Sequence, residues 1–434
     1  MSSYKRRPSP GNTDWFVHDR FGMFIHFGLF SMPARHEWVR YDEMISDEDY
    51  QPYFDYFNPD LFDAREWARK AKEAGMKYAV LTTKHHEGFC LFDSQYTEYK
   101  ITNTPFGRDL VKEYVEAFRE AGLKVGFYYS LLDWNHPHFP IDDIHPLAIR
   151  EDAQALNEGR DMKVYAQYMR DQVTELLTNY GKIDILWFDF SYDALPDHPH
   201  YQPWMKGKRA ADWESEKLIA LARELQPGVI IDNRTDIEQD LWTPEQIDRE
   251  QWITHPETGE LVTWEVCHTF SGSWGYYRDE HTWKSPEMLI ATIVKTVASG
   301  GNLLMNVGPT ARGNFDYRAD AALETYAKWM KLNGRSIYGC TKAEPEFVAP
   351  LGCRLTQSED GKRLYIHILE YPFEYLPMPC LTGKVAYSQF LHDASELPFR
   401  DKASSRCGEV MESTFVLPIL KPNVTVPVIE VFLK

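Results

Sequence analysis

Hydrophobic residues in the first three quarters of the chain alternate between short, nearly unbroken apolar runs and longer stretches with helical spacing. The clearest run is residues 182–190, Lys-Ile-Asp-Ile-Leu-Trp-Phe-Asp-Phe. So few polar positions indicate a strand covered on both faces, as in a parallel sheet. In residues 110–121, by contrast, apolar side chains recur at helical spacing until Gly122. The two patterns together predict a parallel sheet covered by helices.

The same alternation recurs along residues 1–340. It predicts strands over residues 21–28, 77–86, 124–130, 182–190, 228–234 and 303–309, and helices near 61–74, 110–121, 165–177, 214–225, 285–300 and 319–333. No glycine-rich loop typical of dinucleotide or phosphate binding accompanies these strands. We therefore predict an α/β fold, a (β/α)8-type TIM barrel, as the catalytic domain.

The pattern changes near residue 340. Short β-type runs at 363–369, 383–390 and 426–433 alternate with turns, and no convincing helical stretch lies among them. Such spacing is typical of a small antiparallel sandwich. We predict a C-terminal β-sandwich domain over residues 341–434.

Charge and composition narrow the classes of partner. The chain has 434 residues, with 47 basic against 65 acidic side chains and a net charge of −18. This balance argues against a nucleic-acid partner or an anionic membrane surface, and no apolar stretch approaches the length of a membrane span. The six cysteines are scattered without paired spacing, which favours reduced thiols over a disulfide framework or a zinc site. We expect a cytoplasmic protein and leave open whether it forms a homo-oligomer.

Candidate chemistry gathers where the predicted strands end. In barrels of this class the catalytic groups occupy that rim. Carboxylates, imidazoles and indoles that converge there suit a sugar, because charged groups bind hydroxyls, aromatic rings cover the C–H face, and two carboxyl groups can perform the chemistry. The candidates, in chain order, are His26, Glu37, Trp38, His85, His86, Tyr129, Asp189, Arg234, Glu245, Glu265 and Trp274.

Other interpretations exist for these positions. A single His or Trp at a strand end is more often a core or rim residue, and Asp189 could simply cap the next element. His85, His86 and Glu87 could instead bind a metal, since imidazole and carboxylate suit zinc or iron. Neighbouring strand residues face opposite sides, however, so we expect that both imidazoles do not reach one ion.

Several stretches, in order across about residues 14–340, resemble glycoside hydrolase family 29 α-L-fucosidases. They are residues 20–28, 36–38, 77–89, 126–130, 186–189, 233–234, 243–246, 264–265, 273–276 and 300–309.

The resemblance implies a retaining exo-α-L-fucosidase that removes terminal α-L-fucose from oligosaccharides or glycoconjugates. Asp189 would be the nucleophile that forms a covalent fucosyl-enzyme, and a second carboxyl group would act as acid and then as base. We favour Glu245, in Thr-Pro-Glu-Gln, over Glu265, and expect partial burial against Trp242 or Trp274 to keep it protonated. The residues implied to bind fucose are His26, Glu37, Trp38, His85, His86, Tyr129, Arg234 and Trp274, the last against the methyl group.

The family needs no metal or other cofactor, and it has a C-terminal β-domain. One departure concerns the residue after the nucleophile, which is often Gly in the family and is Phe190 here. A bulky side chain at that position leaves the leaving-group preference open. Two alternatives are a non-catalytic fucose-binding protein on a degenerate barrel, which would be expected to lose a carboxyl group, and a metal-dependent barrel hydrolase.

Overall fold

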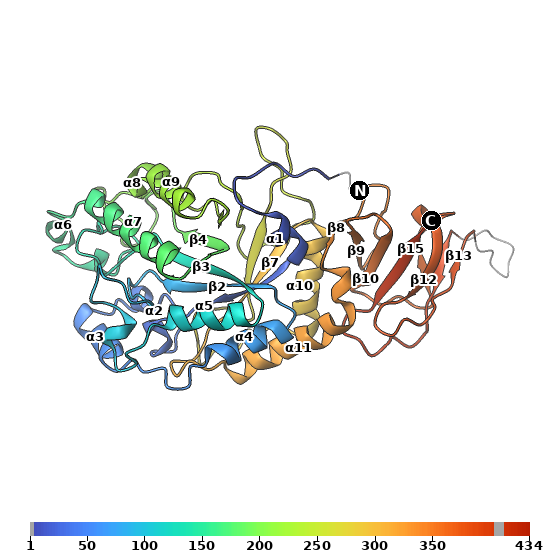
Figure 1. The fold of residues 1–434 in the computed structure, drawn as a ribbon, viewed down its shortest axis with the longest axis horizontal. Coiled ribbons are helices and arrows are strands. Elements are labelled where there is room, and N and C mark those ends of the chain that lie inside the picture. The colour runs from blue at the N-terminus through green and yellow to red at the C-terminus, as the bar shows by residue number, and fades with distance from the viewer. Residues whose placement is uncertain (1–3, 403–411) are drawn as a thin grey trace.

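A seven-stranded parallel sheet forms the centre of the computed structural model, which describes residues 4–402 and 412–434 (Figure 1). The strand order is β5-β4-β3-β2-β1-β7-β6, and every neighbouring pair is parallel. The strands are β1 (Phe21–Ile25), β2 (Tyr78–Lys84), β3 (Lys124–Ser130), β4 (Ile185–Asp189), β5 (Ile230–Ile231), β6 (Glu265–Thr269) and β7 (Asn302–Val307). All their carboxyl ends therefore meet at one edge of the sheet.

Helices alternate with the strands. They are α1 (Asp14–Asp19), α2 (Val39–Asp42), α3 (Asp47–Asp55), α4 (Ala64–Glu73), α5 (Leu110–Glu120), α6 (Ala153–Leu156), α7 (Met162–Asn179), α8 (Ala210–Trp213), α9 (Ser215–Leu225), α10 (Pro286–Ala298) and α11 (Tyr317–Asn333). The longer ones, such as α5, α7 and α10, cover the outer face of the sheet. Asp63, Asp109, Asp161, Ser285 and Asp316 cap the longer helices by accepting first-turn backbone N–H groups. The helices predicted from apolar spacing are confirmed.

The two faces of the curled sheet pack against different apolar clusters. Side chains such as Phe24, Tyr128 and Trp187 fill the concave interior. The alternate positions, such as Phe127 and Phe188, pack outward against the helices. Burial on both faces explains why these strands are apolar at almost every position.

The predicted eight-stranded barrel is not confirmed, because the sheet does not close as a regular ladder. β5 has two residues, and residues 241–245 pair with their neighbours through the isolated parallel bridges Asp232–Leu241, Trp242–Trp264 and Glu245–Cys267 instead of a continuous ladder. Beyond β5 the expected strand becomes irregular, since the side chain of Asn233 accepts the Thr243 backbone N–H at 3.2 Å. The observed architecture is a curled, parallel half-barrel.

Antiparallel sheets form the C-terminal region, as predicted, and lie beside α10 at the end of the molecule away from α6 (Figure 1). The five-stranded sheet has the order β12-β15-β10-β9-β8, and a three-stranded sheet has the order β11-β14-β13. The strands are β8 (Cys340–Lys342), β9 (Cys353–Ser358), β10 (Arg363–Ile368), β11 (Tyr375–Pro377), β12 (Val385–Phe390), β13 (Phe399–Arg400), β14 (Thr414–Val416) and β15 (Val428–Leu433).

Two further observations concern the described ranges. None of their helices is both long and apolar enough to span a bilayer. Cys90, Cys267, Cys340, Cys353 and Cys380 have free thiols, and Cys407 lies outside the described residues.

Candidate active site

A pocket opens at the carboxyl ends of the parallel strands. Nine of the eleven candidates line it: His26, Glu37, Trp38, His85, His86, Asp189, Arg234, Glu245 and Trp274. Phe24, Tyr128, Trp187, Phe190 and Cys267 complete the lining. Tyr129 and Glu265 are not among the lining residues.

Asp189 is the last residue of β4, and its side chain is 11% exposed. Its Oδ2 accepts the Tyr128 hydroxyl at 2.8 Å, and its Oδ1 accepts Arg234 Nη1 at 2.7 Å. Burial, with a further contribution from Asp189, raises the pKa of Tyr128, so the phenol remains a donor. The carboxylate is thereby fixed in an orientation and faces the pocket.

Arg234 joins two carboxylates. Its Nη2 donates to Glu245 Oε2 at 3.0 Å, while Nη1 binds Asp189. Its guanidinium carbon also lies 4.4 Å from the centre of the Trp187 ring. Adjacent nitrogens of one rigid, permanently charged group therefore hold Asp189 and Glu245 close together.

Glu245 stands at the mouth of the pocket, with its side chain 43% exposed. The predicted partial burial of Glu245 is wrong, because the side chain is exposed, and the Trp242 indole N–H donates to Glu238 at 3.3 Å. The nearest charged partner of Glu245 is Arg234, at 3.0 Å. A group that binds in the pocket and projects outward would meet this carboxylate.

The prediction that Glu265 lies at the carboxyl end of a strand is wrong. It is the first residue of β6, paired with Asn302, the first residue of β7, so it lies at the amino end of the strands. It is 0% exposed and accepts the Tyr78 hydroxyl. Burial raises its pKa to about 8. The sequence suggested that a strand ended near Glu265, whereas a strand begins there.

The prediction that Tyr129 faces the pocket is also wrong. Its hydroxyl donates to Gln172 Oε1 at 2.8 Å, in the layer between β3 and α7. Side chains alternate along a strand, so Tyr128 faces the pocket and Tyr129 faces away from it. The motif was located correctly, but the choice between adjacent tyrosines was wrong.

His26 follows β1 and presents a neutral imidazole. Its Nδ1 lies 2.6 Å from Asn306 Oδ1, and Asn306 Nδ2 donates to the Trp274 carbonyl at 2.7 Å. Because that carbonyl can only accept, the Asn306 oxygen must face His26, and His26 Nδ1 donates the proton. Burial lowers the pKa of His26 to about 4, although Asn306 and Asp189 act in the opposite direction. Nε2 is therefore left as an acceptor.

His86 is oriented by Ser130. The Ser130 hydroxyl lies 2.7 Å from His86 Nδ1, donates to the Leu132 carbonyl at 3.0 Å and accepts the Leu132 N–H at 3.0 Å. Because the single Ser130 hydroxyl proton goes to the Leu132 carbonyl, Ser130 accepts a hydrogen bond from His86 Nδ1. His86 Nε2 is therefore left as an acceptor. Burial lowers the pKa of His86 to about 3.

His85 lies beside His86, with ring centres 3.9 Å apart. The expectation that the two imidazoles face opposite sides is wrong, because both follow the last residue of β2 in a turn. Burial, reinforced by His86 and His26, holds the pKa of His85 well below its ordinary value. Across residues 4–402 and 412–434, no group of three or more His, Cys, Asp or Glu side chains is arranged to hold a metal ion.

Glu37 and the aromatic residues complete the walls. Glu37 Oε2 accepts the Gly275 backbone N–H at 2.7 Å, and burial raises its pKa despite that bond. The ring of Trp274 lies 5.2 Å from that of His26, and Trp38 lies 5.5 Å from Phe190. Polar acceptors between aromatic faces suit a small molecule with both hydroxyl groups and an apolar face.

The sequence did not identify Phe24, Tyr128, Trp187 and Cys267 as lining residues. The two-residue period of a strand was the available signal, because Trp187 lies two positions before Asp189 and Phe24 two before His26. Cys267 offered no such signal, since β6 was not predicted.

Comparisons with known proteins give one consistent result. The family model described as Alpha-L-fucosidase matches residues 2–335. A plasma alpha-L-fucosidase from Homo sapiens is 32% identical over 82% of this chain and 76% of its own length. Alpha-L-fucosidase isoenzyme 1 from Paenibacillus thiaminolyticus has a TM-score of 0.89 and 42% identity, covering 97% of this chain and 98% of its own. A trapped covalent intermediate of a GH29 alpha-L-fucosidase from Bacteroides thetaiotaomicron, in complex with 2-fluoro-fucosyl fluoride, has a TM-score of 0.80 and 26% identity over 100% and 99% of the two chains.

Proposed function

The chain belongs to the alpha-L-fucosidase family, and from this premise we propose that it is a retaining exo-α-L-fucosidase acting on fucosylated oligosaccharides or glycoconjugates. One observation supports the proposal most directly. Asp189 lies within the pocket and Glu245 at its mouth, and both bind the guanidinium of Arg234. Retaining glycosidases need such a close pair of carboxyl groups.

In the proposed reaction, Asp189 attacks the anomeric carbon while Glu245, as the acid, protonates the departing glycosidic oxygen. An ester forms between fucose and Asp189. Glu245, now a carboxylate, then takes a proton from water, which attacks the anomeric carbon and releases fucose. Tyr128 and Arg234 bind the two oxygens of Asp189 and so hold it in place for both steps. The trapped covalent intermediate of the Bacteroides relative supports this order of events.

Recognition of the sugar would come from the remaining lining residues. His26 and His86, neutral and with Nε2 as acceptor, would accept hydroxyl protons from fucose. Glu37, His85 and Trp38 would bind further hydroxyls, and Trp274 would cover the methyl group. Phe24 and Trp187 close the bottom of the pocket, which favours removal of a terminal sugar.

Three finer points are also proposals. Residues 241–245 would occupy the eighth barrel position, supported by their isolated parallel bridges to both neighbouring segments. The enzyme would need no metal or other cofactor for the reaction above. The cytoplasmic location, the lack of nucleic-acid and membrane partners, and the question of a homo-oligomer stay predictions from the sequence. No observation supports a non-catalytic protein, since the relatives are described as fucosidases.

The test is release of 4-nitrophenol from 4-nitrophenyl α-L-fucopyranoside, with the first-formed sugar followed by proton NMR. We expect the α-anomer of L-fucose to appear first, because two displacements retain configuration. First appearance of the β-anomer would contradict the retaining mechanism, and no fucose release would contradict the function. A panel of α1,2-, α1,3-, α1,4- and α1,6-linked fucosides would then define the linkage.

Asp189→Asn should lower kcat by about a thousandfold or more, because the amide cannot form the ester. L-fucose binding should persist, since the other pocket residues remain. The matched control is Asp193→Asn at an exposed position four residues further on, which should keep wild-type kcat. If the Asp189 variant kept about a tenth of the activity, Asp189 would not be the nucleophile.

A further inference from the structure

We propose that the buried ion pair Lys84–Asp133 positions the turn formed by residues 85–88, and through it the imidazoles that face the sugar. The inference rests on the proposed function. Neither residue lines the pocket, so both would be positioning residues and not catalytic ones.

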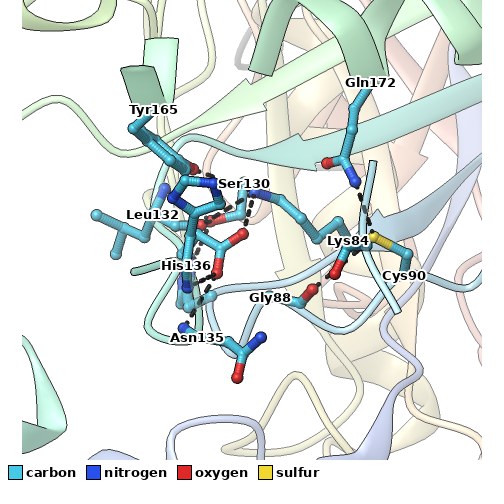
Figure 2. Close-up of polar contacts among 12 residues, drawn as sticks. Lys84, Gly88, Cys90, Ser130, Leu132, Asn135, His136, Tyr165 and Gln172 are labelled. Carbon is cyan, nitrogen blue, oxygen red and sulfur yellow. Dashed lines mark hydrogen bonds and ion pairs between the residues drawn. The ribbon is translucent and has the colours of Figure 1, made fainter. Parts of the chain in front are cut away.

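The pair is buried unusually deeply for two charges. Lys84 Nζ lies 3.2 Å from Asp133 Oδ2, with the side chains 0% and 2% exposed. The ammonium also donates to Tyr165 of α7 at 3.1 Å and lies 4.3 Å from the centre of the Tyr129 ring. Figure 2 shows Lys84 extending toward Tyr165 and the segment that contains Leu132, Asn135 and His136.

Such a pair contributes little to stability by itself. Removing two charges from water is costly, and well-packed apolar residues often replace a buried pair without loss of stability. A role in fixing the local geometry explains the burial of this ion pair better than stability does, because the pair joins the ends of two adjacent strands. Lys84 is the last residue of β2, and Asp133 lies three residues beyond β3.

Asp133 packs directly against the turn. Gly88 closes the turn by donating its N–H to the His85 carbonyl at 3.0 Å, and its φ is +82°. A Cβ on Gly88 would lie 2.2 Å from Asp133 Oδ1. Only glycine fits between the turn and the carboxylate, so a shift of Asp133 would move the backbone that bears His85 and His86.

A second connection runs through the segment after Asp133. Asp133 Oδ1 accepts the backbone N–H groups of Asn135 at 3.0 Å and His136 at 2.9 Å. Between them, Trp134 donates its N–H to the His86 carbonyl at 2.8 Å. The carboxylate thus holds the loop that in turn holds His86.

A bulge in β2 explains why a lysine fits here. The pairing of β2 with β3 shifts between Thr82 and Lys84, where one extra residue is inserted. Lys84 consequently points toward α7, whereas His85 enters the pocket on the other side. Lys84 therefore anchors the end of β2 on the side that faces α7, and the imidazoles of His85 and His86 lie on the side that faces the pocket.

The test compares two double variants of matched chemistry. Lys84→Met with Asp133→Asn removes the pair without leaving an unpaired buried charge, and the amide oxygen introduced at position 133 can still accept backbone N–H groups. The control is Lys208→Met with Asp142→Asn, because that ion pair is also buried, at 4% and 1%, and Asp142 also accepts a backbone N–H, from Ile144. The measurements are Tm, Kd for L-fucose by calorimetry, and kcat and KM for 4-nitrophenyl α-L-fucopyranoside well below Tm.

We expect both double variants to fold and their Tm values to change to a similar extent. Only the Lys84/Asp133 variant should raise Kd for L-fucose about tenfold or more and lower kcat/KM about a hundredfold. If its Kd and kcat/KM stay within about twofold of wild type, or if the control loses as much, the positioning role is wrong.

If the double variant does not fold, a further variant provides a second test of the positioning role. Gly88→Ala presses on the carboxylate from the opposite side and should cause the same loss of L-fucose affinity, and unchanged affinity would overturn the inference. If wild-type enzyme neither binds L-fucose nor releases it from the aryl fucoside, the proposed function fails instead.

Discussion

Glu245 and Glu265 show how the surroundings of one residue type decide its chemistry. Glu245 is partly exposed and bound to Arg234 at the mouth of the pocket. Glu265 is fully buried at the amino end of β6, against Tyr78. Of the two, only Glu245 lines the pocket, whereas Glu265 belongs to the packed interior of the half-barrel.

Glu245→Ala should therefore slow hydrolysis in proportion to the basicity of the leaving group. We expect a loss of about a hundredfold or more with a poor leaving group such as methoxide, and a much smaller loss with 2,4-dinitrophenolate, which departs unaided. Azide should restore part of the rate. Glu265→Ala is the comparison: if it showed this leaving-group dependence and azide rescue while Glu245→Ala did not, the assignment would be reversed.

Glu265 should instead affect stability in a pH-dependent way. Burial raises its pKa from 4.5 to about 8, so the neutral carboxyl favours the folded state. This contribution is complete below about pH 4.5 and is lost as the pH rises through about 8, on the order of 5 kcal/mol in all. Glu265→Gln stays neutral, so its free energy of unfolding should fall less between pH 5 and 8 than that of wild type. Parallel pH profiles from chemical denaturation would contradict this.

At the scale of elements, the turn after β4 combines strain with an aromatic wall. Phe190 has a φ of +78°, a conformation that costs a bulky residue about 1 kcal/mol or more. Its ring nevertheless packs 4.9 Å from that of His86 and 5.5 Å from that of Trp38. The Phe190 ring therefore forms part of the pocket wall next to Asp189 at the expense of backbone strain.

Phe190→Gly and Phe190→Ala should separate these two effects. Both remove the ring, so both should raise kcat/KM for branched fucosylated oligosaccharides relative to the aryl fucoside, by about tenfold. Only Gly relieves the backbone, so it should be about 1 kcal/mol more stable than Ala in urea denaturation. Equal changes for both substrates would show that the ring does not restrict the entrance.

The elements also show which parts of the fold could be predicted from sequence. β2, β3, β4 and β7 were found because their residues are apolar on both faces. β6 was missed because Glu265, His268 and Thr269 interrupt its apolar pattern, although all are buried. Tyr129 was chosen over Tyr128 because a motif gives the position of a strand but not the face of each residue.

At the scale of the molecule, the half-barrel and the C-terminal sheets share a core. Tyr365, Leu391, Val426 and Val428 belong to the same apolar cluster as the barrel helices. Trp329 of α11 donates its indole N–H to the Val426 carbonyl at 2.9 Å. The two parts therefore bury each other's apolar surface.

Deletion of residues 341–434 should leave a barrel fragment that is poorly soluble or loses its cooperative melt, because it exposes the face that packs on Val426 and Val428. Soluble yield, near-ultraviolet circular dichroism and dye binding check this. A soluble, active fragment with wild-type Tm would instead show that residues 1–340 fold independently, as the predicted domain boundary allows.

The irregular attachment of residues 241–245 affects how such a protein can evolve. Asp189 lies in a strand paired with β3 and anchored by the core, so a change in its backbone disturbs the whole sheet. Glu245 lies at the end of an irregular segment that pairs with its neighbours through isolated bridges, so a change in the chain beyond it disturbs less of the sheet. Natural selection can thus remodel the side that receives the leaving group while the sugar side stays constant, and descendants of one fucose pocket can diverge in the glycans they trim.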